Sequence, residues 1–578
     1  MTQTNSDIAR ALDRLADLLE IEEANPFRVR GYRNAARTID GLSHSIADMV
    51  AEGADLTEIY GIGDDLARKL RSLVETGRLP ALEQAQKRVP VQVSELMAIE
   101  QLGPKRVKAL YKALGVKSVA DLEKAARAGR VRGLSGFGEK TERHILEGIE
   151  RLRERHGRTR LSEAEQVVGP LVAYLEGASG VKRVAVAGSY RRRKETVGDL
   201  DILVTCRNSD PVMKRFTGYE RVARVVSRGD TRSTVHLKSG LQVDLRVVPE
   251  RSYGAALQYF TGSKAHNVAL RAIAQDRGLK LNEYGVYRGD KWLAGRTEKS
   301  VYAQLDLPYI EPELREDRGE IKAARAGRLP RLVRLRDIRG DLHAHTTATD
   351  GHATLEQMAR GARDRGYEYI AITDHSKRLA MAHGLDEKRL AAHVEAIDAL
   401  NERLQGITVL KGIEVDILEN GELDLPDRVL ATLDICVCAV HYHWNLSRAA
   451  QTRRIKRAMA NPHCHVLAHP SGRLINEREP YEVDMEALIA AAAEHGVIME
   501  LNAQPARLDL TDEYRRMAKD YAVKVAVSTD AHSVDNLDLM SFGIDQARRG
   551  WLEKGDVVNT LSLAALRRLL NKRGKRTA

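Results

Sequence analysis

The feature that most constrains the fold is a series of short apolar segments separated by helix-length stretches. Six such segments follow residue 340, at 369–373, 408–413, 435–440, 465–468, 497–501 and 524–528. Each has the length and composition of a buried strand. Strands that alternate with helices predict a parallel sheet, and here we expect the sheet to close into a barrel.

Nine side chains with metal-binding chemistry lie in this region, most of them directly after one of the apolar segments. They are His343, His345, Asp350, His375, Glu414, His441, His469, Asp530 and His532. Because the strand ends of a βα barrel gather at one rim, these side chains should converge there. Mixed imidazole and carboxylate ligands suit Mn²⁺, Zn²⁺ or Fe²⁺ better than Mg²⁺. A lone histidine is more often a surface or capping residue, but nine such residues favour a metal centre.

Charge divides the chain near the same point. The chain of 578 residues has 92 Lys and Arg against 81 Asp and Glu, and this excess lies before residue 341. Thirteen of the 18 histidines follow that residue. A basic half suits a polyanionic partner, whereas a nearly neutral, His-rich half suits metal chemistry. This asymmetry disfavours one uniform fold, and we expect several domains.

Composition excludes other classes of protein. No run of 18 or more apolar residues occurs, so we expect no transmembrane helix and no membrane partner. The first ten residues are polar and lack the apolar core of a signal peptide. Four cysteines are too few for a disulfide framework in a chain of this length.

A glycine-containing turn occurs three times in the basic half, each time before an amphipathic helix. The copies lie at 59–63, 99–104 and 134–138, and the second has Gln101 where the others have their first glycine. Glycine permits a sharp turn and leaves amides exposed at the helix start, where a phosphate is favoured. This pattern is typical of helix-hairpin-helix elements, which hold a nucleic-acid backbone. The expected DNA-binding glycines are Gly61, Gly63, Gly103, Gly136 and Gly138.

Three aspartates follow a Gly-Ser turn and an arginine cluster in the region expected to be α+β. Asp199 and Asp201 are two residues apart, so on a strand they share one face, and Asp244 lies on a separate strand. Three neighbouring carboxylates repel one another unless cations neutralise them. Oxygen ligands suit Mg²⁺ or Mn²⁺, and two such ions activate a 3′-hydroxyl and stabilise a pyrophosphate leaving group.

At these residues the sequence resembles the family X DNA polymerases, the family of DNA polymerase beta, over about residues 7–316. The resemblance includes Gly188-Ser189, the segment 259–263 and the segment 307–314. It implies that Asp199, Asp201 and Asp244 bind the catalytic metals. The residues that it implies for nucleotide binding are Gly188, Ser189, Arg192, Tyr259, Phe260, Gly262, Asn267 and Arg271. One departure is Gln242, which stands where the beta-type site has arginine.

The first 85 residues resemble the lyase domain of the same family. Lys69 matches its Schiff-base lysine, and Tyr32 matches a tyrosine of that pocket. A lysine nucleophile needs a lowered pKa, which nearby cations such as Arg28, Arg30, Arg33 and Arg68 could supply. The alternative is that Lys69 only contacts a DNA phosphate, and Asp65 replaces a basic residue of the family pocket.

The region after residue 341 resembles the PHP (polymerase and histidinol phosphatase) domain, a distorted (βα)₇ barrel that holds up to three metals. All nine ligand positions of that family are filled here, which implies an active phosphoesterase. His352, His443, His463 and His465 are assigned structural or solvated roles. Asp374 is assigned the role of orienting a ligand.

We therefore expect a multidomain chain with an all-α N-terminal region, an α+β palm, a small thumb and a (βα)₇ barrel. The expected bounds are 1–85 for the lyase-like domain, 86–160 for the fingers, 161–249 for the palm, 250–316 for the thumb, 317–340 for a linker and 341–570 for the PHP domain.

The expected function is gap filling in base excision repair. The PHP domain would act as a 3′-5′ exonuclease and possible AP endonuclease. The expected partners are gapped or primed double-stranded DNA and deoxynucleoside triphosphates, in a monomer located in the cytoplasm at the nucleoid. Two alternatives stay open: a metabolite phosphatase with a nucleic-acid-binding module, and a template-independent nucleotidyltransferase.

Overall fold

The structure is a computed structural model that describes residues 5–40, 42, 46–59, 61–90, 93, 96–99, 102–155 and 158–574. Tyr60 of the first glycine turn, and Glu100 and Gln101 of the second, lie outside the described residues. The chain divides into two compact units. One contains residues 1–179, 196–199 and 209–244, and the other contains residues 180–195, 200–208 and 245–578.

The N-terminal part of the first unit is helical, as predicted. Its helices are α1 (Asn5–Ile21), α2 (Pro26–Asp40), α3 (Ile46–Ala51), α4 (Asp64–Thr76), α5 (Pro80–Arg88), α7 (Pro104–Leu114), α8 (Val119–Arg127) and α9 (Glu139–Arg155). The apolar positions of α1 recur at helical spacing, so Ile8, Leu12 and Leu15 share one face and are fully buried. They belong to one hydrophobic core that extends from α1 to Ile149 of α9.

The predicted glycine turns begin new helices. Gly63 is the N-cap of α4 and Gly103 the N-cap of α7, and no side chain caps either helix. Gly61 and Gly136 adopt positive φ angles of 77° and 81°, which favour glycine because it has no Cβ. A Cβ at any of the five predicted glycines would meet no atom within 4 Å. The turns are therefore uncrowded, which leaves room for a phosphate at the helix starts.

A five-stranded sheet follows in the order β2-β4-β7-β6-β5. Its strands are β2 (Val181–Val186), β4 (Asp199–Cys206), β5 (Val222–Arg228), β6 (Arg232–Leu237) and β7 (Gln242–Val247), accompanied by α10 (Leu161–Glu176), α11 (Gly188–Arg191) and α12 (Ser209–Thr217). Two short strands, β1 (Thr159–Arg160) and β3 (Thr196–Val197), pair separately. The strand expected at Asp199 and Asp201 is β4 and the one expected at Asp244 is β7, whereas β5 and β6 were not expected. β5 is largely exposed and carries no apolar alternation, so its pattern gave little signal.

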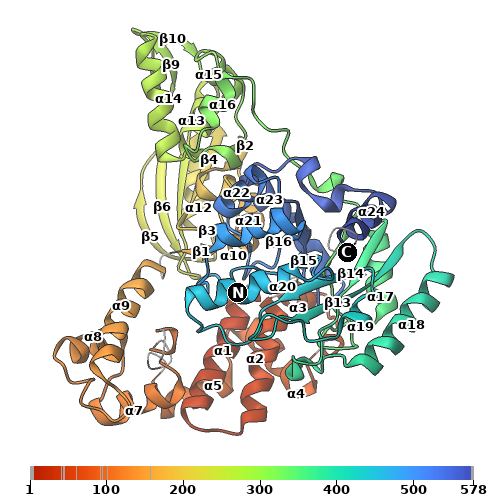
Figure 1. Ribbon diagram of the computed structural model, residues 1–578. Helices are drawn as coiled ribbons and strands as arrows, with labels where there is room; N and C mark the ends of the chain where they lie inside the picture. The colour runs from red at the N-terminus through yellow and green to blue at the C-terminus, as the bar shows by residue number, and fades with distance from the viewer. Residues whose placement is uncertain are drawn as a thin grey trace. The chain divides into compact units, whose positions relative to one another are not determined.

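The thumb region packs around a hydrophobic core that also includes Leu332 and Trp551 from further along the chain. It contains α13 (Tyr253–Thr261), α14 (Lys264–Asp276), the strands β8 (Lys280–Asn282), β9 (Gly285–Arg288) and β10 (Lys291–Ala294), and the helices α15 (Glu298–Ala303) and α16 (Glu320–Arg325). The three strands form an antiparallel sheet in the order β10-β9-β8, grouped with α14, α15 and α16 in Figure 1.

The C-terminal region is the predicted parallel barrel. Its seven strands follow one another in chain order: β11 (Gly340–Asp341), β12 (Tyr369–Ile372), β13 (Thr408–Asp416), β14 (Ile435–Ala439), β15 (Val466–Leu467), β16 (Ile498–Asn502) and β17 (Val525–Ser528). A parallel bridge between Ala344 and Ala531 nearly closes the barrel. The helices are α17 (Leu355–Asp364), α18 (Glu387–Arg403), α19 (Asp427–Leu430), α20 (Arg448–Ala460), α21 (Met485–His495), α22 (Asp512–Asp520), α23 (Met540–Arg549) and α24 (Leu563–Gly574).

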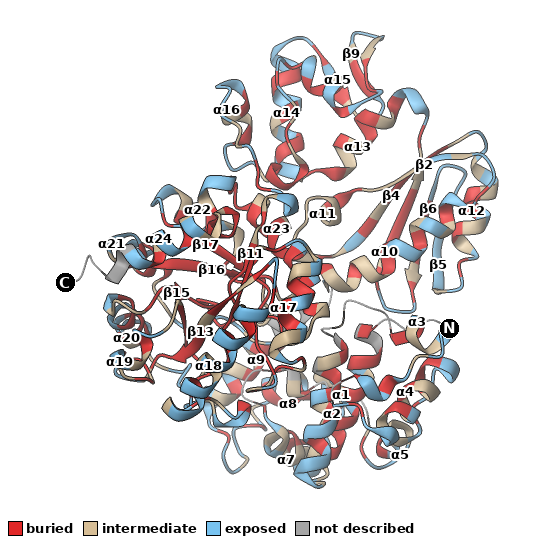
Figure 2. Cartoon of the chain, turned by 90° about the vertical axis from the view of Figure 1, so that its right-hand side faces the viewer, coloured by how far each residue is buried: buried red, intermediate tan, exposed pale blue. Residues whose placement is uncertain are grey.

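Alternate side chains of the barrel strands pack in two different cores. Ala371, Leu410 and Val437 belong to one cluster together with Leu566 of α24. The intervening residues, such as Ile370 and Ile372, pack against the helices. Figure 2 shows these strands buried, while the outer faces of helices such as α18 are exposed. A two-residue period therefore fixes which side chains face the barrel interior.

Within the described residues, no helix is both long enough and apolar enough to cross a membrane.

Candidate functional site

The structure brings the nine predicted ligands together at the carboxyl ends of the barrel strands. Three groups have ligand atoms that all lie within 4.8 Å of one another: His345, Asp350, His375 and His532; His343, His345 and Asp530; and His375, Glu414 and His441. His469 joins them because its Nε2 lies 3.0 Å from Oε1 of Glu414. His345 and His375 each belong to two groups, so the groups form one continuous site.

Strand geometry explains why three of these side chains converge. Glu414 continues the two-residue period of Leu410, which faces the barrel interior, and His441 continues that of Val437. His375 has the same relation to Ala371. In these three cases the two-residue period therefore continues from an interior position to a ligand position.

Glu414 is the centre of the cluster. It is 1 % exposed, and five imidazoles lie within 3.6 Å of its carboxylate. Those imidazoles are His343, His345, His375, His441 and His469. A single buried carboxylate does not satisfy so many nitrogens by hydrogen bonding alone, and it suits a ligand shared between cations.

Several ring nitrogens in this site lack hydrogen bonds. Among the described residues, Nε2 of His343, Nδ1 of His345 and Nδ1 of His375 are buried without a hydrogen-bond partner. Nδ1 of His375 lies 2.8 Å from Oε2 of Glu414, but not at a hydrogen-bonding angle. Buried polar atoms rarely remain unpaired, so these nitrogens fit metal ligation. The residues present are therefore suited to divalent cations.

Outer carboxylates orient the imidazoles, and two of them were not expected from the sequence. Glu500 on β16 lies 2.7 Å from Nδ1 of His343, and Asp416 lies 3.0 Å from Nδ1 of His441. Such contacts fix the tautomer, so that the other ring nitrogen faces the metal. The only sequence signal for Glu500 is that it is an acid inside an apolar strand. Asp374 accepts hydrogen bonds from the hydroxyls of Thr346 and Thr349, in the loop after His345.

Burial and the surrounding carboxylates act in opposite directions on these histidines when no metal is bound. Burial alone would lower the pKa of His441, but Glu414 and Asp416 raise it to about 9. The pKa values of His343 and His375 lie well above the usual value for the same kind of reason, and that of His532 is also raised. His345 is the exception, because burial and two neighbouring histidines lower its pKa.

Metal affinity should therefore depend on pH. A metal ligand must be a neutral imidazole, so each protonated histidine must lose its proton on binding. We expect the affinity of the metal-stripped protein for Mn²⁺ to rise between about pH 6.5, the ordinary pKa of histidine, and about 9, the pKa of His441. Calorimetry in buffers of different ionisation enthalpy should detect proton release. An affinity that stays constant over this range contradicts the prediction.

Asp244 is the most enclosed of the three predicted polymerase aspartates. It is 6 % exposed and accepts hydrogen bonds from Thr234 (2.5 Å), Gln242 (2.8 Å) and Arg232 (3.3 Å). Burial would raise the pKa of Asp244, but these hydrogen bonds outweigh burial and lower it. The carboxylate is therefore ionised at neutral pH. Gln242 thus has a definite role here, since its amide donates to Asp244.

Asp199 and Asp201 lie at the start of β4 and share a strand face, as predicted. Gly188 explains how the preceding turn approaches them. A Cβ at Gly188 would lie 2.7 Å from Oδ2 of Asp201, and the residue has a positive φ of 64°. Both observations require glycine at this position.

The predicted nucleotide-binding residues lie in one compact unit. The Arg192 guanidinium donates to the carbonyl of Thr261 (2.5 Å) and to Glu316 (3.0 Å). It also lies close to Gly262, because a Cβ added to Gly262 would be 3.1 Å from Nη1 of Arg192. The rings of Tyr259 and Phe260 pack edge to face with centroids 5.2 Å apart.

The remaining predicted nucleotide contacts differ in exposure. Ser189 is half-buried and Arg271 is exposed. Asn267 is buried, and its amide is bound to Gln258 and to the carbonyl of Tyr259 (both 2.7 Å). Asn267 therefore holds the end of α13 in this structure.

Lys69 lies beside Tyr32, as the lyase resemblance implies, but its electrostatic environment differs from the expectation. Its Nζ donates to the Tyr32 hydroxyl (2.9 Å) and to Asp65. Burial would lower the pKa of Lys69, but these two hydrogen bonds outweigh burial and raise it. Two of the four expected cations are paired with acids in this structure: Arg33 pairs with Asp17 and Glu20, and Arg68 pairs with Asp65.

This pairing predicts weak Schiff-base chemistry, because a protonated lysine is not a nucleophile. We expect Asp65→Asn to increase borohydride trapping on a 5′-deoxyribose-phosphate end, since it removes an acid that stabilises the charged lysine. Lys69→Ala serves as the control and should give no cross-link. If borohydride traps the unmodified protein and Asp65→Asn to the same extent, Asp65 does not have this role.

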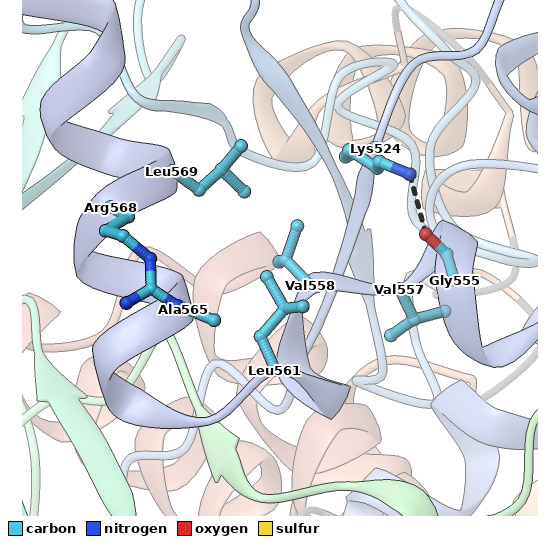
Figure 3. Close-up of a pocket in the computed structure, with 8 residues that line it drawn as sticks. All are labelled: Lys524, Gly555, Val557, Val558, Leu561, Ala565, Arg568 and Leu569. Atoms are coloured by element: carbon cyan, nitrogen blue, oxygen red, sulfur yellow. Dashed lines mark hydrogen bonds between the residues drawn. The ribbon is translucent and has the colours of Figure 1, made fainter.

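A cavity of about 290 Å³ lies among residues near the amino end of β17 and on α24. It is lined mainly by apolar side chains, and Lys524 donates a hydrogen bond to the Gly555 carbonyl (2.6 Å; Figure 3). Asp530 follows the opposite end of β17. None of the predicted site residues lines this cavity, so it is separate from the metal cluster.

Family models match most of the chain. A helix-hairpin-helix domain matches residues 3–79 and a SAM-like helix-hairpin-helix tandem matches residues 93–151. The DNA polymerase beta palm matches residues 158–250 and the DNA polymerase beta thumb matches residues 256–316. The PHP domain matches residues 341–525.

The curated relatives of this chain include proteins of two kinds. The DNA polymerase/3′-5′ exonuclease PolX of Bacillus subtilis (strain 168) is 36 % identical over 96 % of this chain and 97 % of its own length. A probable phosphatase of Thermoanaerobacter sp. (strain X514) is 31 % identical over 33 % of this chain and 78 % of its own length. A probable phosphatase of Syntrophotalea carbinolica is 29 % identical over 38 % of this chain and 90 % of its own length.

Proposed function

Because the chain belongs to the family X DNA polymerases that carry a PHP domain, we propose that it both extends and trims DNA 3′ ends. Synthesis takes place in the palm with deoxynucleoside triphosphates. Removal of 3′-terminal nucleotides takes place at the barrel metal cluster. The observation that carries this proposal is the presence of both sites in one chain: an Asp triad with its Gly-Ser turn, and nine converging metal-binding side chains.

In the palm, the chain's own residues supply binding and orientation. Asp199, Asp201 and Asp244 would hold two Mg²⁺ or Mn²⁺ ions, which activate the primer hydroxyl and stabilise the leaving pyrophosphate. Ser189 and Arg192 hold the incoming triphosphate, Tyr259 and Phe260 border its sugar, and Arg271 faces the nascent pair. Thr234 and Gln242 keep Asp244 oriented through their hydrogen bonds, which also lower the pKa of its carboxylate.

In the barrel, the nine ligands would hold up to three Mn²⁺, Zn²⁺ or Fe²⁺ ions, which supply hydroxide and bind phosphate oxygens. Glu500 and Asp416 hold His343 and His441 in the orientation that ligation requires. Arg507 has its Nε 4.0 Å from Oδ2 of Asp530, so it can bind a phosphate at the edge of the site.

The substrate proposed for the whole chain is a short gap in double-stranded DNA, as in base excision repair, acted on by a monomer. The exposed glycine turns support it, because they offer helix starts to a DNA backbone in the basic half. Such contacts make binding strongly dependent on salt concentration.

The test uses a gapped duplex and a primer with a 3′ mispair, each with Mg²⁺ or Mn²⁺ alone. We expect extension of the gapped primer and shortening of the mispaired one. Extension without a template strand would favour a template-independent transferase. Hydrolysis of small phosphate esters without any action on DNA would favour the phosphatase alternative.

A further inference from the structure

The nucleotide loop, defined here as residues 188–195, is bound by the barrel domain within the same compact unit. Two side chains of α23 donate to consecutive backbone carbonyls of the loop. Nη1 of Arg549 donates to the carbonyl of Arg192 (2.7 Å), and Nε2 of Gln546 donates to the carbonyl of Arg193 (2.8 Å). Because both bonds go to the backbone, they fix the path of the loop itself.

Two ion pairs hold the loop further along. Arg193 pairs with Asp545 of α23 (3.1 Å). Glu195 accepts two hydrogen bonds from Arg473 (2.6 and 3.1 Å), a bidentate geometry that fixes direction as well as distance. Arg473 follows the metal ligand His469 by four residues and also donates to the carbonyl of Leu508 (2.6 Å).

These contacts are built into the folded chain. Gln546 is 1 % exposed, Arg549 5 % and Arg473 8 %. Arg515, which is fully buried, holds Gln546 in place by donating to its side-chain oxygen (3.2 Å). Breaking such contacts would leave buried charges without partners, which is strongly unfavourable. The loop and the barrel domain are therefore expected to behave as one rigid element.

A shared carboxylate connects Arg549 with Arg192, the residue proposed to bind the triphosphate. Oε1 of Glu316 lies 3.0 Å from Nε of Arg192 and 3.0 Å from Nη1 of Arg549. Arg549 thus compensates part of the negative charge of Glu316. Without Arg549, Glu316 would be left with Arg192 and the nearby Lys194, and more of its charge would oppose the binding of a phosphate by Arg192.

We propose that the barrel domain positions the nucleotide loop, so that Arg549 and Arg473 set the affinity of the polymerase site for its incoming triphosphate. This inference rests on the proposed polymerase function. It gives the barrel a role in synthesis that is separate from its metal chemistry. Arg549 and Arg473 are positioning residues, since they act through the loop backbone, Glu195 and Glu316.

The test compares Arg549→Ala with Arg548→Ala in the full-length protein on a gapped primer. Arg548 is the matched control, because it lies next to Arg549 on α23 but pairs with Glu313 instead of the loop. We expect Arg549→Ala to raise KM for the deoxynucleoside triphosphate about tenfold, equivalent to ~1.4 kcal/mol, with a smaller change in kcat. Arg548→Ala should leave this KM unchanged, and both variants should retain 3′ degradation.

The double variant Arg549→Ala with Glu316→Gln distinguishes a loss of charge compensation from a loss of stability. Removal of the uncompensated carboxylate should restore most of the lost affinity, which a merely unstable variant would not show. If Arg549→Ala fails to fold, Glu195→Gln tests the proposal instead. This variant weakens the contact with Arg473 by changing the more exposed of the two residues, and it should also raise KM for the triphosphate.

The outcomes distinguish this inference from the proposed function. A wild-type protein that neither extends primers nor binds a triphosphate in calorimetry overturns the polymerase function. If the wild-type protein extends primers but Arg549→Ala, Arg548→Ala and Glu195→Gln all have the same KM for the triphosphate, only the positioning role is overturned.

Discussion

Replacing Asp244 with alanine is expected to abolish DNA synthesis while leaving 3′ degradation intact. Asp244 is buried and held ionised by three hydrogen bonds, so its carboxylate is preorganised to bind a cation. Its removal should lower primer extension by roughly 10³-fold or more, because the cation and the reacting hydroxyl lose their common anchor. Single-nucleotide incorporation on a gapped primer measures the loss.

The matched control is Asp230→Ala, which removes an exposed acid from the neighbouring hairpin and should leave extension unchanged. Asp244→Asn preserves size and tests charge alone. Retained degradation shows that each variant is folded. If Asp244→Ala also eliminated degradation in a folded protein, the two activities would share one site and the two-site proposal would fail.

The second large effect is expected for Glu414→Gln, which should eliminate 3′ degradation and leave synthesis intact. Five imidazoles surround this carboxylate, and glutamine removes its charge with little change in volume. The loss should exceed the roughly 10–100-fold that removal of an outer hydrogen-bond partner costs at a metal site. Metal content per chain, measured by mass spectrometry, should fall together with shortening of a mispaired primer.

Glu419→Gln is the control, since Glu419 follows the same strand but lies in a surface pair with Arg378. It should retain both metal and degradation. A double variant, His343→Ala with His345→Ala, should reproduce the effect of Glu414→Gln. Normal degradation by either ligand variant would show that the nuclease lies outside the barrel cluster.

The barrel is predictable from the sequence because its signals are local. Apolar runs such as 369–373 and 435–440 reveal their buried strands directly, and the ligand chemistry of His375 and His441 appears immediately afterwards. The rule that parallel strands end at one rim then brings the ligands together without any coordinates. The exposed strand β5 was missed because solvent on both faces leaves no periodic pattern.

Contacts between distant residues needed the tertiary structure. The Lys69 environment shows this, since Arg33 appeared to be an available cation until the structure paired it with Asp17 and Glu20. Glu500 was likewise an ordinary acid until the fold placed it beside His343, 157 positions away in the chain. In each case the electrostatic role depends on a partner that local sequence does not identify.

The sequence by itself thus determined the order of the domains, the strand periodicity of the barrel and the residue types of both candidate sites. Only the tertiary structure decided which groups hold those residues in place: Gln242 on Asp244, Asp65 on Lys69, and Arg549 on the backbone of Arg192. The physical reason is that periodicity is a property of neighbouring residues. Charge compensation and hydrogen bonding depend on distance in space, and the contact of Arg549 with Arg192 joins residues 357 positions apart.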